Sequence, residues 1–212
     1  METQSGGFNP AEQELLRSLA TPAKIQTYLD GTPYSAEPIY RSPRSVMRDG
    51  KAHCFDGAVF AAAALRAIGY PPLIMELKAV RDDDHLLALF RREGYWGAVA
   101  KSNFAGLRYR EPIFRNLREL SLSYFEEFFN INGEKTLRSY SVSLDLRRFD
   151  ARFWQTNDTA LDRIADRLDS IRHYPLINSR QERGLAPVDE RLYRAGLLGA
   201  DEKGLYKPDS VK

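Results

Sequence analysis

The stretch CFDGAVFAAAALRAIGYPP, residues 54–72, limits the possible folds of this chain more than any other segment. Alanine and leucine favour a helix, Gly69 can end it, and two prolines at 71 and 72 prevent its continuation. Four consecutive alanines at 61–64 leave a narrow helix surface. Because such a surface lets a sheet approach closely, we expect this helix to pack against strands.

Three strand candidates follow the helix, at residues 72–80, 85–90 and 95–102. Apolar and β-branched residues dominate the first, and a turn sequence, RREG, separates the other two. The pattern predicts an antiparallel β-meander, and the whole chain is then of the α+β class. A four-residue RREG loop would place His85 opposite Ala100, whereas a two-residue Glu-Gly loop would place it opposite Ser102.

The other segments predict further elements around this core. Residues 1–10 read as a flexible N-terminus, and residues 11–212 as one domain, with a core at about 21–150 and a helical extension at about 151–212. Thr21 and Pro22 are suited to begin a helix that ends at Gly31. We expect an extended segment at 32–50, helices at 11–20, 113–129, 158–172 and 189–197, and a half-buried strand at 137–146.

Composition excludes several classes of protein. The chain has 31 Lys and Arg against 29 Asp and Glu, which gives no argument for binding nucleic acid or a membrane surface. A single cysteine excludes an intramolecular disulfide and a multi-cysteine metal site. The N-terminus lacks a signal-peptide pattern, and the longest apolar run, near 58–65, is too short to cross a bilayer. We therefore expect a cytoplasmic protein without a cofactor.

That single cysteine, Cys54, begins the alanine-rich helix. A helix N-terminus favours a thiolate, since its unpaired N–H groups carry partial positive charge, and those groups can also hold an oxyanion. A nucleophilic thiol needs a base. Of the three histidines, His53 is adjacent in sequence and His173 is distant, whereas His85 opens a strand that should lie beside the helix. Cys54 and His85 are therefore the candidate pair.

These motifs, in this order, resemble the transglutaminase-like superfamily of the wider papain-like group of cysteine enzymes. The resemblance covers roughly residues 21–103 and implies a cysteine-bearing helix packed against an antiparallel β-meander with flanking helices. It implies Cys54 as nucleophile and His85 as general base. The usual aspartate, four residues after the strand tryptophan, is replaced here by Ala100. Ser102 and Asn103 are the nearby candidates to orient the histidine.

Other polar and aromatic residues near the pair have two interpretations each. Asp56 either binds substrate or interacts favourably with the helix dipole from the first turn, and the second interpretation is favoured. Trp96 shares the sheet face of His85 and either packs or walls a substrate groove. Asp82 and Asp84, next to His85, form either a solvated acidic turn or a divalent-cation site; we expect no metal.

Together these features predict a thiol-dependent amide hydrolase or acyltransferase of the peptidase, amidase or transglutaminase-like kind. Its substrates would be peptides or small molecules with an amide bond, and hydrolysis is favoured because water is always available as acceptor. The alternative is a weak or inactive scaffold that binds peptides or a protein partner. A metal-dependent hydrolase is the third hypothesis. The oligomeric state is left open by the sequence.

Overall fold

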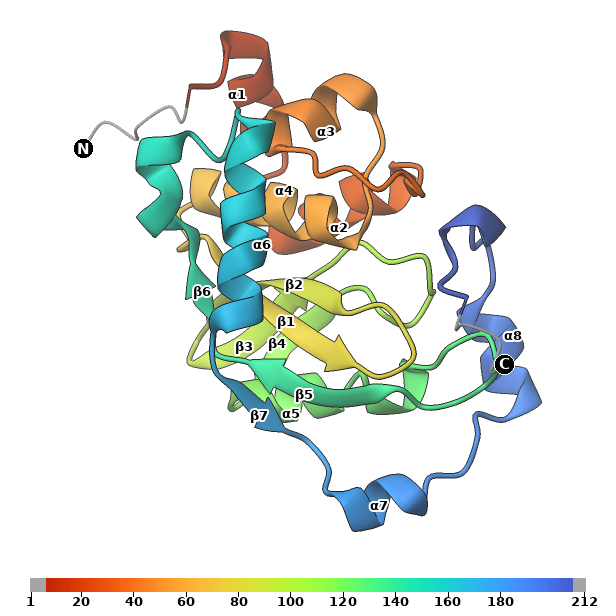
Figure 1. The fold of residues 1–212 in the computed structure, drawn as a ribbon. Helices are drawn as coiled ribbons and strands as arrows, with labels where there is room; N and C mark the ends of the chain where they lie inside the picture. The colour runs from red at the N-terminus through yellow and green to blue at the C-terminus, as the bar shows by residue number, and fades with distance from the viewer. Residues whose placement is uncertain (1–6, 208–212) are drawn as a thin grey trace.

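A computed structural model describes residues 7–207 of the chain. Helices lie along one side of an antiparallel sheet, and the C-terminal segment runs along one edge of the molecule (Figure 1). This arrangement confirms the α+β class. The α-helices are α1 (Pro10–Ser18), α2 (Pro22–Gly31), α3 (Pro43–Asp49), α4 (Cys54–Ala67), α5 (Leu117–Leu122), α6 (Leu161–Ser170), α7 (Ser179–Arg183) and α8 (Glu190–Gly196).

The sheet has the strand order β4-β3-β2-β1-β5-β7, and β6 pairs separately with β1. All of its paired strands run antiparallel. The strands are β1 (Leu73–Ala79), β2 (His85–Arg92), β3 (Tyr95–Val99), β4 (Arg110–Phe114), β5 (Leu137–Ser141), β6 (Leu144–Asp145) and β7 (His173–Pro175). Short 3-10 helices are η1 (Phe125–Glu127), η2 (Leu146–Arg152), η3 (Asp158–Ala160) and η4 (Glu202–Gly204).

Helix α4 packs on one face of this sheet, as its alanines predict. The four alanines at 61–64 are fully or almost fully buried and share a core cluster with Leu86, Ala88 and Phe90 of β2. At Gly57 the helix lies very close to the segment after β3, because a Cβ added there would lie 2.1 Å from Cβ of Lys101. Small side chains therefore set the distance between helix and sheet.

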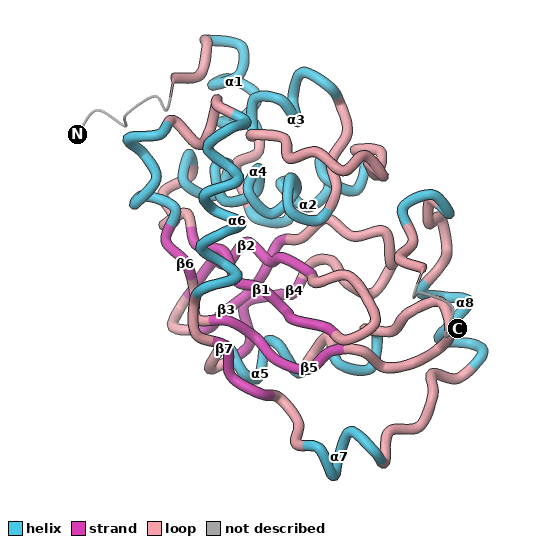
Figure 2. The backbone as a smooth tube through the Cα atoms, viewed as in Figure 1, coloured by secondary structure: helices cyan, strands magenta, loops and turns pink. Residues whose placement is uncertain are grey.

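The other face of the sheet carries a second core cluster, which is rich in aromatic residues. Leu87, Leu89 and Ala98 point into it, together with Tyr124 and Phe128 from the segment after β4. In Figure 2 the large helices lie on one side of the strands and α5 lies on the other. The sheet is thus covered on both faces.

The hairpin between β2 and β3 has a two-residue loop. Glu93 and Gly94 both have positive φ, 52° and 89°, as a two-residue hairpin turn requires, and Arg92 pairs with Tyr95. Of the two registers considered, the Glu-Gly register is therefore the one observed. Continued beyond the last paired residues, it places His85 opposite Ser102.

Two of the predicted elements were wrong. The segment at 32–50 is not extended throughout, because Ser42 caps a helix that has Pro43 at its first turn and Gly50, with φ 63°, at its end. The single helix predicted at 113–129 is instead β4, α5 and η1. Asn116 caps α5 by accepting a hydrogen bond from the Glu119 N–H, so the chain leaves the strand before it becomes helical.

The two ends of the chain also differ from expectation. Residues 1–6 of the predicted flexible N-terminus lie outside the described residues, but Phe8 is buried and Asn9 caps α1. The predicted helix at 189–197 is present as α8, and the C-terminal region adds a strand as well, since β7 pairs with β5. The extension is therefore part of the sheet, not a helical appendage.

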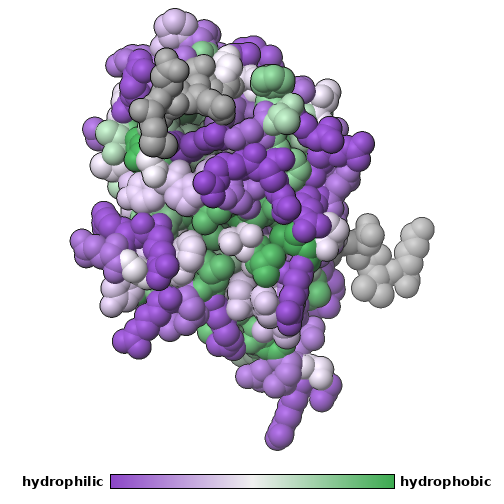
Figure 3. Space-filling view, turned by 90° about the vertical axis from the view of Figure 1, so that its left-hand side faces the viewer, coloured by the Kyte–Doolittle hydropathy of each residue, from purple (hydrophilic) through white to green (hydrophobic). Residues whose placement is uncertain are grey.

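On the face shown in Figure 3, hydrophilic residues dominate and apolar residues gather near the middle. Between Gly7 and Lys207, none of the helices has the length and apolar character needed to cross a membrane.

Candidate functional site

The first turn of α4 fixes the backbone around Cys54. His53 is the N-cap, and its Nδ1 accepts hydrogen bonds from the N–H groups of Phe55 (3.1 Å) and Asp56 (3.4 Å). The Asp56 carboxylate in turn accepts the His53 N–H at 3.3 Å. This reciprocal capping box confirms that Cys54 occupies the first helical position.

The thiol of Cys54 is free and only partly exposed. Its S–H is directed at the backbone carbonyl of Asp84, with a sulfur–oxygen distance of 3.7 Å. Burial raises the thiol pKa to about 12, and the carboxylates of Asp83 and Asp56 act in the same direction. The N–H groups of Phe55 and of Cys54 itself lower the pKa, but they do not outweigh burial. Burial therefore favours the neutral thiol, whereas the helix N-terminus favours the thiolate.

His85 begins β2, and the residue is 4% exposed. Its Nε2–H donates to the backbone carbonyl of Leu107 at 2.8 Å, and the ring meets Phe128 edge to face. Burial lowers the histidine pKa to about 4, aided by the Arg110 charge and opposed by the hydrogen bond to Leu107. A neutral imidazole that donates from Nε2 carries its basic lone pair on Nδ1.

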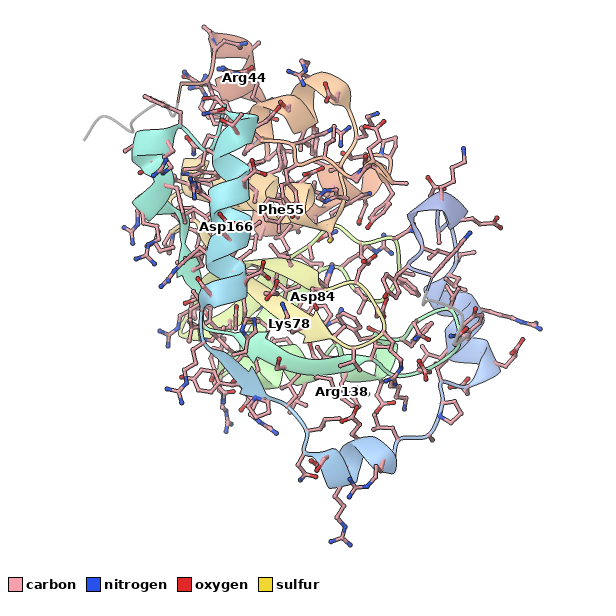
Figure 4. The ribbon with its side chains drawn as sticks, in the orientation of Figure 1. Arg44, Phe55, Lys78, Asp84, Arg138 and Asp166 are labelled. Carbon is pink, nitrogen blue, oxygen red and sulfur yellow. The ribbon has the colours of Figure 1, made fainter. Side chains whose placement is uncertain are left out.

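Cys54 and His85 line the same small cavity, of about 40 Å³, at the end of the sheet where β2 begins. The cysteine arrives on the helix-covered side, whereas His85 belongs by strand alternation to the face that carries the aromatic cluster. Among residues 7–207 no hydrogen bond joins the sulfur to the imidazole. Figure 4 shows this end of the sheet, with Lys78 and Asp84 close together below Phe55 of α4.

A larger cavity, of about 460 Å³, also has Cys54 in its wall. The loop at 35–40 forms one side of it, and buried Arg41 anchors that loop by donating from its backbone N–H to Asp56 at 2.7 Å. The floor and the opposite side come from β1, β2 and α6. Five carboxylate residues and Lys203 are part of the lining: Glu37, Glu76, Asp83, Asp84 and Asp169.

Tyr34 lies between these cavities and was not singled out by the sequence. It lines both of them, and an isolated bridge to Ala52 fixes its backbone beside the start of α4. Burial raises the pKa of its phenol, and the nearby Cys54 N–H acts in the opposite direction. A lone tyrosine in a Pro-rich segment carries no sequence signal for such a position.

The residues proposed to orient His85 have other partners. The hydroxyl of Ser102 accepts the Phe104 N–H at 3.0 Å. The amide of Asn103 exchanges two hydrogen bonds, both 2.8 Å, with the backbone of Asp201. Both residues line the small cavity, but the group on the imidazole is the Leu107 carbonyl. Sequence reasoning missed it because a backbone carbonyl has no residue signature.

The two expected substrate-binding residues lie outside both cavities that contain Cys54. Asp56 is fully buried in the capping box and pairs with Arg41, at 3.6 Å between Oδ2 and Nη1. Burial raises its pKa to about 7, although the Arg41 contacts lower it. Trp96 lies near the hairpin turn with the Arg91 guanidinium over its ring, six residues along the register from Ser102, or about 20 Å. Asp56 therefore has a structural role, and Trp96 walls no groove near the thiol.

The acidic turn before β2 has protein partners as well. The Asp82 carboxylate accepts the Thr136 hydroxyl at 2.6 Å, and Asp84 accepts the Ala79 N–H at 2.7 Å and pairs with Lys78 at 3.1 Å. Over the described part of the chain, no three His, Cys, Asp or Glu side chains converge as a metal site. The carboxylates of the metal hypothesis are thus engaged in holding the turn.

Comparisons with known proteins found only distant structural similarity. No family model matches the chain, and a search of curated proteins found no match. A structure of Legionella pneumophila LapG is similar at 20% identity and a TM-score of 0.35, covering 43% of this chain and 59% of that chain. An EGTA-treated LapG structure is similar at 16% identity and a TM-score of 0.40, covering 73% and 86%. Values this low assign neither a family nor an activity.

Proposed function

We propose that the protein is a thiol-dependent hydrolase of amide bonds, with Cys54 as nucleophile and His85 as general base. One observation supports this most strongly: the cysteine at the first position of α4 and the histidine at the first position of β2 line one cavity. A buried imidazole held at Nε2 by Leu107 is the arrangement a base acting through Nδ1 needs.

The reaction begins when the thiol turns from the Asp84 carbonyl toward the small cavity. The sulfur attacks the amide carbonyl carbon while its proton passes to Nδ1 of His85, which gives a tetrahedral oxyanion. The C–N bond then breaks, and the imidazolium returns its proton to the leaving amine, which leaves a thioester on Cys54. Water attacks the thioester and its proton passes to Nδ1; cleavage of the C–S bond then releases the acid while the imidazolium returns its proton to the sulfur, which restores the thiol.

The N–H groups at the start of α4 are suited to hold the oxyanion. Those of Cys54 and Phe55 already lower the pKa of the sulfur, so they point toward the region where negative charge develops. The 14-residue helix behind them adds its dipole. The Phe55 N–H also donates to His53 Nδ1 in the resting cap, so it must be shared between the cap and the oxyanion when the charge forms.

The raised thiol pKa and the lowered histidine pKa make the resting pair neutral rather than an ion pair. Proton transfer then accompanies attack instead of preceding it. The Leu107 carbonyl orients the imidazole but carries no negative charge, so it stabilises the imidazolium less than a carboxylate would. We therefore expect slower turnover than a Cys-His-Asp arrangement would give.

The substrate binds in the larger cavity beside Cys54. Its volume of about 460 Å³ lies within the range of roughly 300–1,000 Å³ typical of small-molecule sites. A few residues of a peptide, or a small molecule with an amide bond, would fit there. Water is the proposed acyl acceptor.

The test is a screen of fluorogenic peptide amides with the purified protein and with Cys54→Ala and His85→Ala. We expect both variants to lose at least 100-fold in rate. His173→Asn is the control, since His173 also begins a strand and lines neither cavity, and asparagine keeps an N–H donor for the Glu76 carboxylate. Turnover that survives Cys54→Ala would refute the proposal.

A binding scaffold without turnover is the second candidate. It is favoured by the neutral pair and by the engagement of Ser102 and Asn103 elsewhere. Under this alternative, peptides that bind the wild type bind Cys54→Ala equally well, and no peptide is cleaved. Isothermal titration with both proteins separates the two candidates.

A further inference from the structure

The C-terminal segment 201–206, here called the strap, lies against the site from a distant part of the sequence. Lys203, Gly204, Leu205 and Tyr206 line the larger cavity together with Cys54. Gly204 and Tyr206 also line the small cavity that Cys54 shares with His85. The strap is therefore a wall common to both spaces around the thiol. Figure 1 shows this last part of the ribbon rising beyond α8.

One side chain clamps the strap to the body of the protein. Nδ2 of Asn103 donates to the carbonyl of Asp201, and Oδ1 of Asn103 accepts the Asp201 N–H, each at 2.8 Å. The side chain of Asp201 then caps η4 by accepting the Lys203 N–H at 3.0 Å. The clamp and the cap are both exposed to solvent, so their net strength is modest.

A close contact fits the strap against Tyr34. A Cβ added to Gly204 would lie 2.7 Å from both Cδ1 and Cε1 of the Tyr34 ring. Only glycine lets the backbone pass at this distance. Tyr34 itself lines both cavities, so the strap closes directly over the groups that surround the thiol.

The strap is separable from the helix that precedes it. Helix α8 is docked independently, through the Tyr193 hydroxyl to the Ile131 carbonyl at 2.8 Å and the Ala105 N–H to the Gly196 carbonyl at 2.8 Å. Between α8 and the strap, Gly199 has φ 75° and a Cβ there would meet nothing within 4 Å. The segment beyond Gly199 can therefore lift while α8 stays in place.

We propose that the strap is an autoinhibitory lid, which covers Cys54 in the resting protein and must be released from Asn103 before substrate reaches the thiol. Its regulatory meaning rests on the proposed hydrolase function, whereas the access it controls can be measured without turnover. The lid also helps to shield the Cys54 sulfur from water, since lifting it would let water reach both cavities.

The test compares alkylation rates of Cys54 by iodoacetamide, at fixed pH, in full-length variants. Asn103→Ala removes the clamp, and Gly204→Val drives a side chain into the Tyr34 ring. We expect each to raise the second-order rate about tenfold, Asn103→Ala through the loss of two exposed hydrogen bonds and Gly204→Val through the clash with the Tyr34 ring. Fluorescent labelling followed by mass spectrometry assigns the modified residue.

Two matched controls exclude general loosening. Asn178→Ala removes an asparagine that likewise accepts backbone N–H groups, from Arg180 and Gln181, but at the start of α7. Gly184→Val adds the same side chain where a Cβ would meet only ordinary contacts at 3.6 Å or more. Both should leave the alkylation rate unchanged.

Unchanged rates in Asn103→Ala and Gly204→Val, in proteins that melt cooperatively, would overturn the lid. A faster rate in those variants without cleavage of any peptide would sustain the lid and count against the hydrolase.

Discussion

The two faces of the sheet are packed in opposite ways. The face under α4 is built from small residues, with Gly57 and the alanines at 61–64 letting the helix approach closely. The other face is filled by large rings, Tyr124 and Phe128 among them. Cys54 comes from the first side and His85 from the second, and they meet only where β2 begins. The site therefore depends on the packing of both faces of the sheet.

Removing volume from the aromatic face should have the largest effect. Phe128→Ala leaves a cavity beside the His85 ring, and we expect a loss of about 3–5 kcal/mol in the free energy of unfolding, measured by urea denaturation. Phe128→Leu, which keeps most of the volume, should cost clearly less. Equal losses for the two variants would show that this face tolerates empty space.

The burial of His85 should make stability depend on pH. Its folded pKa of about 4 lies below the unfolded value of 6.5, so the unfolded chain binds the proton first as pH falls. Stability from this group is fully present above pH 6.5 and is lost toward pH 4, by up to about 3 kcal/mol. His53, with its pKa lowered to about 4 by burial, acts in the same direction.

Raised carboxyl pKa values oppose this trend, since Asp56 and Asp82 favour their protonated forms in the folded protein. The wild type must therefore be compared with His85→Gln, which keeps a donor for the Leu107 carbonyl. The difference between the two denaturation curves should grow as pH rises from 4 to 6.5. A difference that is constant over this range would mean that His85 titrates normally.

Adding volume to the helix-covered face should cost less, but still measurably. Gly57→Ala places a Cβ against Lys101, and we expect a loss of about 1–3 kcal/mol because α4 and the segment after β3 must separate. Gly31→Ala is the control, since a Cβ there meets nothing within 4 Å and alanine favours the helix. It should be neutral or slightly stabilising, and a similar loss in both would contradict the close approach at Gly57.

The sequence alone determined the central helix, the meander and the position of the cysteine. Alanine-rich composition, Gly69 and the two prolines that follow it act locally along the chain, so local chemistry suffices. The two-residue hairpin was one of two registers open from sequence, and Glu93 and Gly94 at positive φ decided it. The prediction of one helix at 113–129 was wrong because the apolar residues of this segment fit a strand followed by a short helix equally well, and Asn116 begins that helix as its cap.

Only the tertiary structure decided what surrounds the thiol and the imidazole. The Leu107 carbonyl that holds His85, the Tyr34 phenol and the strap clamped by Asn103 all come from segments whose local sequence gives no sign of the site. Burial likewise decided the protonation of Cys54 and His85, since a neighbouring charge or dipole can be read from sequence but the exclusion of water cannot. Desolvation is a property of the whole packed chain, and for this pair it outweighs the helix N-terminus.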